Sequence, residues 1–219
     1  MIVFLLGLLI TIFIFQKIFF GKTIPDRMKK ESEKTRKIYN RQIPELIPWT
    51  VHDMELLSYH LHQKSERKGF GHTFRGIFTS IYQENMFIFH HKKPFSKSES
   101  FTIVITAEHE IWYDPKNNVY VNGEILGRID KENRFVNKKL RRTFGMITKT
   151  GTQNHDIFNE KKEMLGSIKI PEDWDLPFPR AVEINQDLNP QDIIIFKILG
   201  CKKIAEIYLN KHQKHSSSD

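Results

Sequence analysis

The first twenty residues form an almost unbroken apolar run, MIVFLLGLLITIFIFQKIFF. The run holds no charge before Lys17, and only Thr11 and Gln16 are otherwise polar. A helix of this length extends about 30 Å, which is the thickness of the hydrocarbon core of a bilayer. The pattern therefore predicts an uncleaved transmembrane anchor over residues 1–21. Its lipid-facing side chains are expected to include Ile2, Phe4, Leu9, Ile14 and Phe19.

Two other interpretations of this apolar run are open. A cleaved secretory signal needs a basic region before the run and a small-residue cleavage site after it, and the chain has neither. A buried core helix is the second alternative, but such a helix is usually apolar on one side, whereas this run is apolar all round. The anchor is favoured over both.

A basic segment follows the apolar run. Residues 22–41 carry eight Lys and Arg residues against three Asp and Glu residues, and only the terminal amine precedes the run. Because positive charge resists translocation, we expect the N-terminus outside and the large C-terminal part in the cytoplasm. Residues 22–49 are therefore predicted to be a basic juxtamembrane linker, which also attracts anionic lipid headgroups.

The apolar pattern changes again after the linker. Positions 51, 54, 57 and 61 recur at helical spacing behind Thr50, a possible N-cap, which predicts a helix over residues 51–67. Short runs rich in β-branched and aromatic residues follow. They predict strands at residues 73–82, 86–91, 101–106 and 110–113.

Two later segments resemble each other at a spacing of 39 residues. Residues 118–129 and 156–168 each read as an apolar strand, a polar turn, an acidic residue, two apolar residues and then Gly-x-Ile. Asn122-Gly123 is typical of a type I′ hairpin turn, and Gly127 and Gly166 lie where a bulge or a close backbone approach is common. The two segments are therefore predicted to be hairpins. Their similarity has two explanations, a structural duplication or a chance similarity between two hairpins.

The C-terminal third ends in a helix. Residues 181–184 predict one more strand, and Asn189 and Pro190 are a typical cap and first position of a helix that continues to Leu209. This helix is apolar nearly all round, so we expect it to be buried. The predicted fold is mainly β (α+β): an antiparallel sheet or closed barrel around an apolar C-terminal helix. Residues 50–210 form the cytoplasmic domain, and residues 211–219 a disordered tail.

Hairpins ending in Gly-x-Ile and an apolar C-terminal helix together resemble the tubby-like superfamily, which includes the LURP-one-related and phospholipid scramblase families. The matching residues are Asn122, Gly123, Ile125, Leu126, Gly127 and Ile129 in one hairpin, and Asn159, Met164, Leu165, Gly166 and Ile168 in the other, with Ile193 to Leu199 as the central helix. The resemblance covers residues 70–209 and implies a barrel of about twelve strands around the helix. It also implies a ligand-binding or membrane-apposed module. The chain departs from the family in its N-terminal anchor and in lacking a clear calcium-binding acidic loop, so scrambling activity is not implied.

The composition and the charge distribution argue against several classes of function. The chain has 219 residues and a formal charge of +8, but most of the excess lies beside the predicted anchor. The remaining domain is nearly neutral, which argues against nucleic acid as a partner. The single cysteine, Cys201, excludes an intrachain disulfide and any zinc site built on several thiolates.

A second basic run is the candidate lipid-binding surface. Residues 131–149 hold seven Lys and Arg residues against one Glu, with aromatic residues between them, a pattern suited to anionic headgroups. A solvated strand pair whose charges keep the domain soluble is the alternative. The predicted lipid-binding residues are Lys138, Lys139, Arg141, Arg142 and Phe144.

The histidines raise the question of a metal site. His60, His62 and Glu66 have the H-x-H-x-x-x-E spacing of cupins, but the flanking glycines and the second cupin motif are missing, and a helix would place the two histidines about 200° apart. His90, His91 and His109 are a second group, although adjacent histidines on a strand face opposite ways. We therefore expect no metal and no cofactor.

The function expected from the sequence is a single-pass, membrane-anchored binding or scaffold module at the cytoplasmic membrane face. Its expected partners are membrane lipids and, as a further candidate, a membrane protein. The chain has no nucleophile elbow, P-loop, Rossmann fingerprint or kinase motif, so a role without catalysis is favoured. Two alternatives stay open. One is an accessory subunit whose first helix packs through Gly7 and Thr11, and the other is a membrane-tethered, metal-dependent enzyme that uses the histidines.

Overall fold

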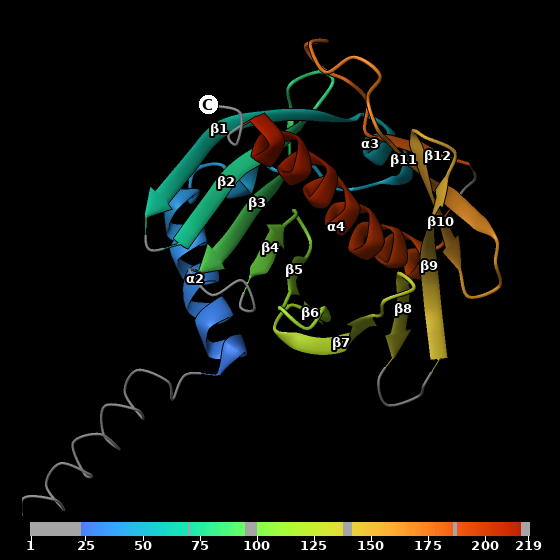
Figure 1. Cartoon of the computed structure of the whole chain (residues 1–219), viewed down its shortest axis with the longest axis horizontal. Coiled ribbons are helices and arrows are strands. Elements are labelled where there is room, and N and C mark those ends of the chain that lie inside the picture. Colours follow the sequence, from blue (N-terminus) through green and yellow to red (C-terminus); the bar gives the residue numbers. More distant parts are fainter. Residues whose placement is uncertain (1–22, 70, 95–99, 138–141, 186–187, 216–219) are drawn as a thin grey trace, which may run out of the picture.

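The computed structural model describes residues 23–69, 71–94, 100–137, 142–185 and 188–215. Within these residues, twelve strands form one antiparallel sheet in which every strand pairs with its neighbour in sequence. The sheet curls around the C-terminal helix α4, and a second long helix, α2, lies outside it (Figure 1). The elements are α2 (Ile24–Ile38), η1 (Ile43–Glu45), α3 (Val51–Glu55), β1 (Leu57–Gly69), β2 (Gly71–Ser80), β3 (Asn85–Pro94), β4 (Phe101–Ile105), β5 (Glu110–Tyr113), β6 (Asn118–Val121), β7 (Glu124–Ile129), β8 (Arg134–Asn137), β9 (Arg142–Thr150), β10 (Asn154–Asn159), β11 (Met164–Lys169), β12 (Val182–Ile184) and α4 (Pro190–His215).

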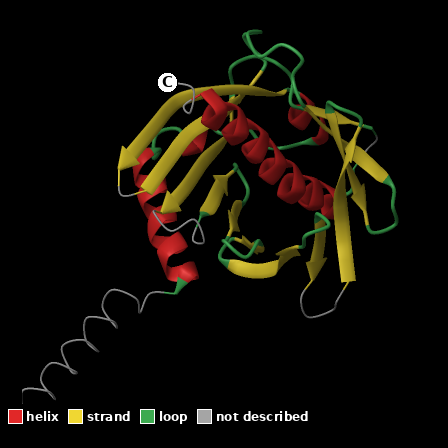
Figure 2. Ribbon diagram, viewed as in Figure 1, coloured by secondary structure: helices red, strands yellow, loops and turns green. Residues whose placement is uncertain are grey.

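The two ends of the sheet meet at a short bridge. Ser58, at the start of β1, pairs with Arg180, just before β12. The N–H of Tyr59 donates to the Pro179 carbonyl at 2.9 Å, and the N–H of Ala181 donates to the Leu57 carbonyl at 2.8 Å. The sheet is therefore a nearly closed barrel (Figure 2), and the mainly β prediction with an apolar C-terminal helix is confirmed at this level.

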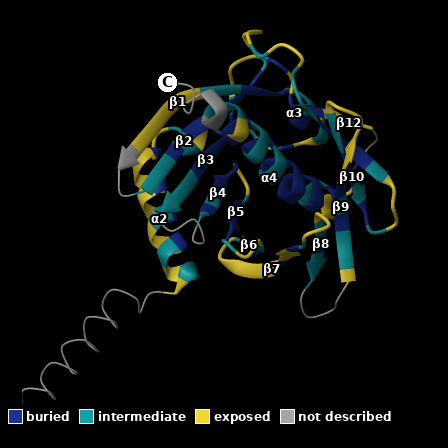
Figure 3. Ribbon diagram, viewed as in Figure 1, coloured by how far each residue is buried: buried dark blue, intermediate teal, exposed yellow. Residues whose placement is uncertain are grey.

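Helix α4 supplies the centre of the interior core. Asn189 caps it, since the N–H of Asp192 donates to Asn189 Oδ1 at 3.0 Å, as the sequence predicts. Phe74 and Phe78 of β2 pack against Tyr208, and Phe78 stacks on Phe87 of β3 at 4.6 Å between ring centroids. Figure 3 shows the buried residues gathered along α4 and the strands beside it. The helix continues to His215, and the His212 ring stacks on Tyr208 at 4.1 Å, so the first residues of the predicted tail are helical.

The two predicted hairpins share a structural irregularity. Val119 pairs with Gly127, and Ile157 pairs with Gly166, and in both hairpins the register shifts at the next residue toward the turn. A Cβ on Gly127 would lie 2.5 Å from the Val136 carbonyl oxygen, so only glycine fits there. The prediction of a bulge or a close backbone approach at these glycines is confirmed, and both features are present.

The predicted helix over residues 51–67 is wrong. The helix α3 ends at Glu55, and the rest of the segment forms β1. Thr50 does cap α3, because the N–H of Asp53 donates to its hydroxyl at 3.2 Å. Leu57 and Leu61 pair with Ser80 and Phe78 of β2, and these long-range strand contacts override the helical spacing.

A second apolar core lies between α2 and the outside of the barrel. Strands β2 to β5 are apolar on both faces, with one set of side chains turned toward α4 and the other toward α2. The segment predicted as a linker therefore contains a packed helix. The outer core consists of Met28, Tyr39, Leu46, Ile77, Ile88, Phe101, Ile103, Ile105 and Trp112.

Candidate membrane-facing site

Helix α2 begins immediately after residues 1–22. Thr23 and Asp26 form a capping box, in which the Asp26 N–H donates to the Thr23 hydroxyl at 3.4 Å and the Thr23 N–H donates to Asp26 Oδ2 at 3.2 Å. Pro25 takes an early helix position, where its missing N–H costs nothing. The basic segment thus has a defined start next to the predicted anchor.

The two sides of α2 differ in chemistry. Met28, Ser32 and Thr35 are buried against the barrel. The exposed side is mostly cationic, with Glu33 as an acidic exception in its middle. We call this exposed side the basic face of α2; its cations are Lys29, Lys30, Lys34, Arg36 and Lys37.

Glu110 of β5 connects α2 to the barrel. The carboxylate of Glu110 is buried and accepts hydrogen bonds from the Ser32 hydroxyl and from the Trp112 indole N–H, the latter at 2.6 Å. Its second oxygen lies 2.6 Å from the Arg36 guanidinium. These three donors compensate the buried charge and hold the middle of α2 in one position on the strands.

A second polar group, His90, lies under the second half of α2. The side chain of His90 is fully buried, and its Nδ1 lies 2.5 Å from the Thr35 hydroxyl and 3.3 Å from Arg75 Nε. Burial, together with the charges of Arg75 and Lys92, lowers the pKa of His90 to about 2. The ring is therefore neutral at physiological pH. His90 Nε2 and Glu31 Oε2 lie 3.9 Å apart, and neither atom has a hydrogen-bond partner among the described residues.

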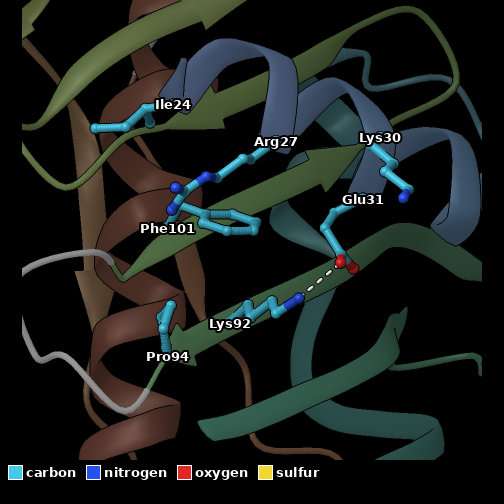
Figure 4. Close-up of a pocket in the computed structure, with 7 residues that line it drawn as sticks. All are labelled: Ile24, Arg27, Lys30, Glu31, Lys92, Pro94 and Phe101. Carbon is cyan, nitrogen blue, oxygen red and sulfur yellow. Dashed lines mark hydrogen bonds and ion pairs between the residues drawn. The ribbon is translucent and has the colours of Figure 1, made fainter. Parts of the chain in front are cut away.

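A pocket of about 340 Å³ opens beside the first two turns of α2 (Figure 4). Glu31 and Lys92 reach toward each other from α2 and β3, with 2.6 Å between Glu31 Oε1 and Lys92 Nζ. Three lining side chains are cationic, one is anionic and three are apolar. The lining residues are Ile24, Arg27, Lys30, Glu31, Lys92, Pro94 and Phe101.

The lipid-binding surface predicted at the second basic run is only partly described. Lys138, Lys139 and Arg141 lie outside the described residues. Arg142 is exposed and forms an ion pair with Glu160. The ring of Phe144 is half-buried and packs on Phe135 at 5.4 Å between ring centroids and on the interior core.

The predicted anchor also lies outside the described residues, including Ile2, Phe4, Leu9, Ile14 and Phe19. Among the residues that the structure does describe, no helix is both long and apolar enough to cross a bilayer.

The histidines occupy separate positions. His60 lies on strand β1, where its Nδ1 is 3.1 Å from the Thr79 hydroxyl, and His62 is exposed. His90 lies beside the Thr35 hydroxyl of α2, whereas His91 Nδ1 lies 3.0 Å from the Thr102 hydroxyl of β4. In the described part of the chain, no group of three or more His, Cys, Asp or Glu side chains could hold a metal ion. Burial raises the pKa of the Cys201 thiol to about 12, so this cysteine is not a reactive thiolate.

The sequence interpretation counted the cations of α2 but missed the helix that arranges them. The Thr23-x-x-Asp26 capping pattern was a usable signal. A second signal was the unbroken apolar character of residues 86–89 and 103–105, which indicates strands covered on both faces. A strand with one face in water alternates apolar and polar residues instead. The contributions of Lys92 and Phe101 to the pocket had no local signal, since they meet α2 only through the barrel.

Comparison with known proteins returned no match to a protein-family model, to a curated protein or to a solved structure.

Proposed function

We propose that this protein is a single-pass, membrane-anchored binding module whose barrel is held at the cytoplasmic face of the membrane. The observation that carries the proposal is the basic face of α2. This face starts at Lys29, eight residues after the predicted anchor 1–21, and the opposite side of α2 is docked on the barrel. An anchor followed by a docked cationic helix would hold the barrel at a fixed distance from the headgroups.

The energetics support contact with anionic lipid. Each Lys or Arg close to an anionic surface contributes about 1 kcal/mol of attraction, which falls off within a Debye length. The basic face offers several cations that are exposed in the present arrangement, and only Glu33 interrupts it. The resemblance to the tubby-like superfamily is compatible with this role, because twelve described strands surround a C-terminal helix as that resemblance implies. Membership of that superfamily remains part of the proposal.

Cysteine labelling of full-length protein in sealed membranes tests the proposal. The only native thiol, Cys201, is fully buried, so a Ser65→Cys substitution on the exposed part of β1 supplies one accessible thiol. We expect a membrane-impermeant maleimide to label this thiol only from the cytoplasmic side, and alkaline carbonate to leave the protein in the membrane. The unsubstituted chain is the matched control. Labelling from the opposite side, or release by carbonate, would contradict the proposal.

A further inference from the structure

Two adjacent apolar side chains of β7 are exposed on the outside of the barrel. Ile125 is 50% exposed and Leu126 is 36% exposed. Consecutive residues of a strand normally point to opposite faces of the sheet. The bulge of this hairpin interrupts that alternation, because Leu126 is its extra residue and lies opposite no residue of β6. The bulge therefore leaves both apolar side chains in contact with solvent.

The corresponding pair in the second hairpin is covered. Met164 and Leu165 are the equivalent residues at a spacing of 39, and Leu165 is likewise the extra residue of its bulge. Leu165 is nonetheless 0% exposed and belongs to the interior core. The N–H of Asn185, just after β12, donates to the Leu165 carbonyl at 3.3 Å. The same local structure thus occurs once with its apolar pair packed and once with the pair open.

The open pair continues an apolar row that α2 covers at its other end. The row follows matching register positions on β4, β5, β6 and β7, and it consists of Ile103, Trp112, Tyr120 and Ile125. Cross-strand partners point to the same face of a sheet. Ile103 and Trp112 belong to the outer core beneath α2, and Tyr120 packs against that core. The open end of the row is therefore continuous with the interface between α2 and the barrel.

The turn of the first hairpin lies beside the middle of α2. The Asn122 N–H donates to the Glu110 carbonyl at 2.8 Å, and the Glu110 N–H donates to Asn122 Oδ1 at 2.9 Å. The carboxylate of Glu110 in turn holds Ser32 and Arg36 of α2. Figure 1 shows β7 and the first turn of α2 toward the same, lower end of the molecule. A bilayer that meets the start of α2 would therefore also lie close to β7.

The size and the charge of the open patch favour a bilayer over a protein partner. A stable protein interface takes about 800 Å² from each partner, and two partly exposed side chains supply only a small part of that area. A bilayer needs no such area, because the predicted anchor already holds the protein at the membrane. Glu124 and Arg128 are exposed on either side of the pair and have opposite charges, so the patch offers little to an ionic partner.

We propose that Ile125 and Leu126 insert into the boundary between lipid headgroups and acyl chains, as a second membrane contact beside the basic face of α2. The aliphatic stem of Arg128 allows its guanidinium to stay among the headgroups while the apolar pair lies deeper. A second contact would stop the barrel from rotating about its anchor. This inference rests on the proposed function, because it requires the start of α2 to lie at the bilayer.

Fluorescence quenching in reconstituted vesicles tests the inference. The dye nitrobenzoxadiazole is attached to Ile125→Cys in the full-length protein, where the buried Cys201 does not compete for the label. The vesicles consist of phosphatidylcholine and phosphatidylglycerol, with or without a phosphatidylcholine that carries a nitroxide near the top of one acyl chain. We expect the nitroxide to reduce the fluorescence by about twofold or more, because an inserted side chain lies about 5–10 Å below the membrane surface.

The matched control is the same dye on Leu176→Cys. Leu176 is 54% exposed, and it belongs to the loop between β11 and β12, which lies at the opposite, upper end of the molecule in Figure 1. The nitroxide should leave the fluorescence of this dye nearly unchanged. Adding Leu126→Asp to the labelled Ile125→Cys chain should bring the quenching close to that of the control at an unchanged urea midpoint, because the exposed side chain contributes little to the fold.

Three outcomes would overturn the inference. If the nitroxide does not quench the dye at Ile125→Cys and the emission is that of a dye in water, the open pair does not touch lipid. Equal quenching at both positions would mean that the bilayer contacts the barrel without regard to this patch. A blue-shifted emission that the nitroxide leaves unchanged would assign the patch to a protein surface, such as a second copy of the chain.

These outcomes are separate from a failure of the proposed function. The nitroxide lipid is present in both leaflets, so the quenching does not depend on the orientation of the protein. The labelling of Ser65→Cys and the carbonate extraction decide the orientation and the anchoring by themselves. An absence of quenching together with cytoplasmic labelling would remove the second contact and leave the proposed function standing.

Discussion

Glu110 is the residue on which the position of α2 most depends. Its carboxylate is buried and accepts from Ser32, Arg36 and Trp112. Glu110→Gln keeps the shape but removes the charge and turns an amide N–H₂ toward one of these donors. We expect the free energy of unfolding to fall by about 2 kcal/mol, discounted because the Arg36 side chain is 46% exposed.

Urea unfolding of the full-length protein in detergent, followed by tryptophan fluorescence, measures this loss. Glu33→Gln is the control, because this substitution removes the same charge from an exposed position of α2. Equal stability of the two variants would mean that Glu110 does not hold the helix.

The buried His90 makes the free energy of unfolding depend on pH. Burial and the charges of Arg75 and Lys92 together lower the pKa of His90 to about 2, whereas an unfolded histidine titrates near 6.5. The contribution of neutral His90 to the free energy of unfolding is therefore complete above pH 6.5. It is lost on acidification, because the unfolded state binds a proton that the folded state excludes. The expected slope is about 1.4 kcal/mol per pH unit.

Unfolding free energies at pH 7, 6 and 5 test this slope above the range in which carboxylates titrate. His91, whose pKa burial lowers to about 4, adds a slope of the same sign. Burial also lowers the pKa values of His60, His109, His155 and His212. His90→Gln should therefore remove only part of the decrease, while His62→Gln at an exposed position should leave it unchanged. A decrease that is identical in all three proteins would exclude His90 as its source.

At the scale of elements, the two bulged hairpins depend on their glycines. A Cβ at Gly127 would lie 2.5 Å from the Val136 carbonyl oxygen, and a Cβ at Gly166 would overlap the Glu183 carbonyl oxygen of β12. Because backbone atoms on both sides are fixed by strand pairing, we expect Gly127→Ala and Gly166→Ala each to cost about 2 kcal/mol or more of unfolding free energy.

Gly123, in the turn of the first hairpin, provides the comparison. Nothing lies within 4 Å of a Cβ there, but its φ of +87° disfavours any other residue. Gly123→Ala should therefore cost about 1 kcal/mol, which is less than either strand substitution. Urea unfolding of the three variants gives the order, and a larger loss at Gly123 would contradict the role of the close approach.

The elements also show what the sequence could predict. Strands β2 to β7, β10 to β12 and helix α4 have local signals: apolar runs, Asn122-Gly123 and the Asn189 cap. Strand β1 misled the interpretation because Leu57 and Leu61 fit both a helical and a strand spacing, and only pairing with β2 decides between them. Local sequence patterns were sufficient to predict an element wherever they agreed with the long-range strand pairing.

The candidate site was less predictable than the fold. The charges of α2 were visible in the sequence, but their division into a docked side and an exposed side depends on partners 55 or more residues away, such as His90 and Glu110. The pocket depends on the same folding, since Lys92 and Phe101 reach α2 only when β3 and β4 lie side by side. Spacing along the chain carries no information on such contacts.

For the whole molecule, α2 joins two properties that usually reside in different segments. It carries the cations that are expected to set the orientation in the membrane, and its other side is fixed to the barrel by an apolar core and by Glu110. Because the two sides do not share residues, the charges of Lys29, Lys30, Lys34 and Lys37 can be removed without disturbing the docked side.

Replacing these four lysines with Gln should therefore change orientation and leave the fold intact. With the positive charge beside the predicted anchor reduced, we expect the Ser65→Cys thiol to become accessible to impermeant maleimide from both sides of the membrane, at an unchanged urea midpoint. A variant with Gln at Lys116, Lys131, Lys149 and Lys161, four exposed positions on the barrel, removes the same charge far from α2 in sequence and should keep a single orientation. Mixed orientation in this second variant, or a single orientation in the first, would show that total charge or the apolar run itself sets the topology, and that the basic face of α2 does not.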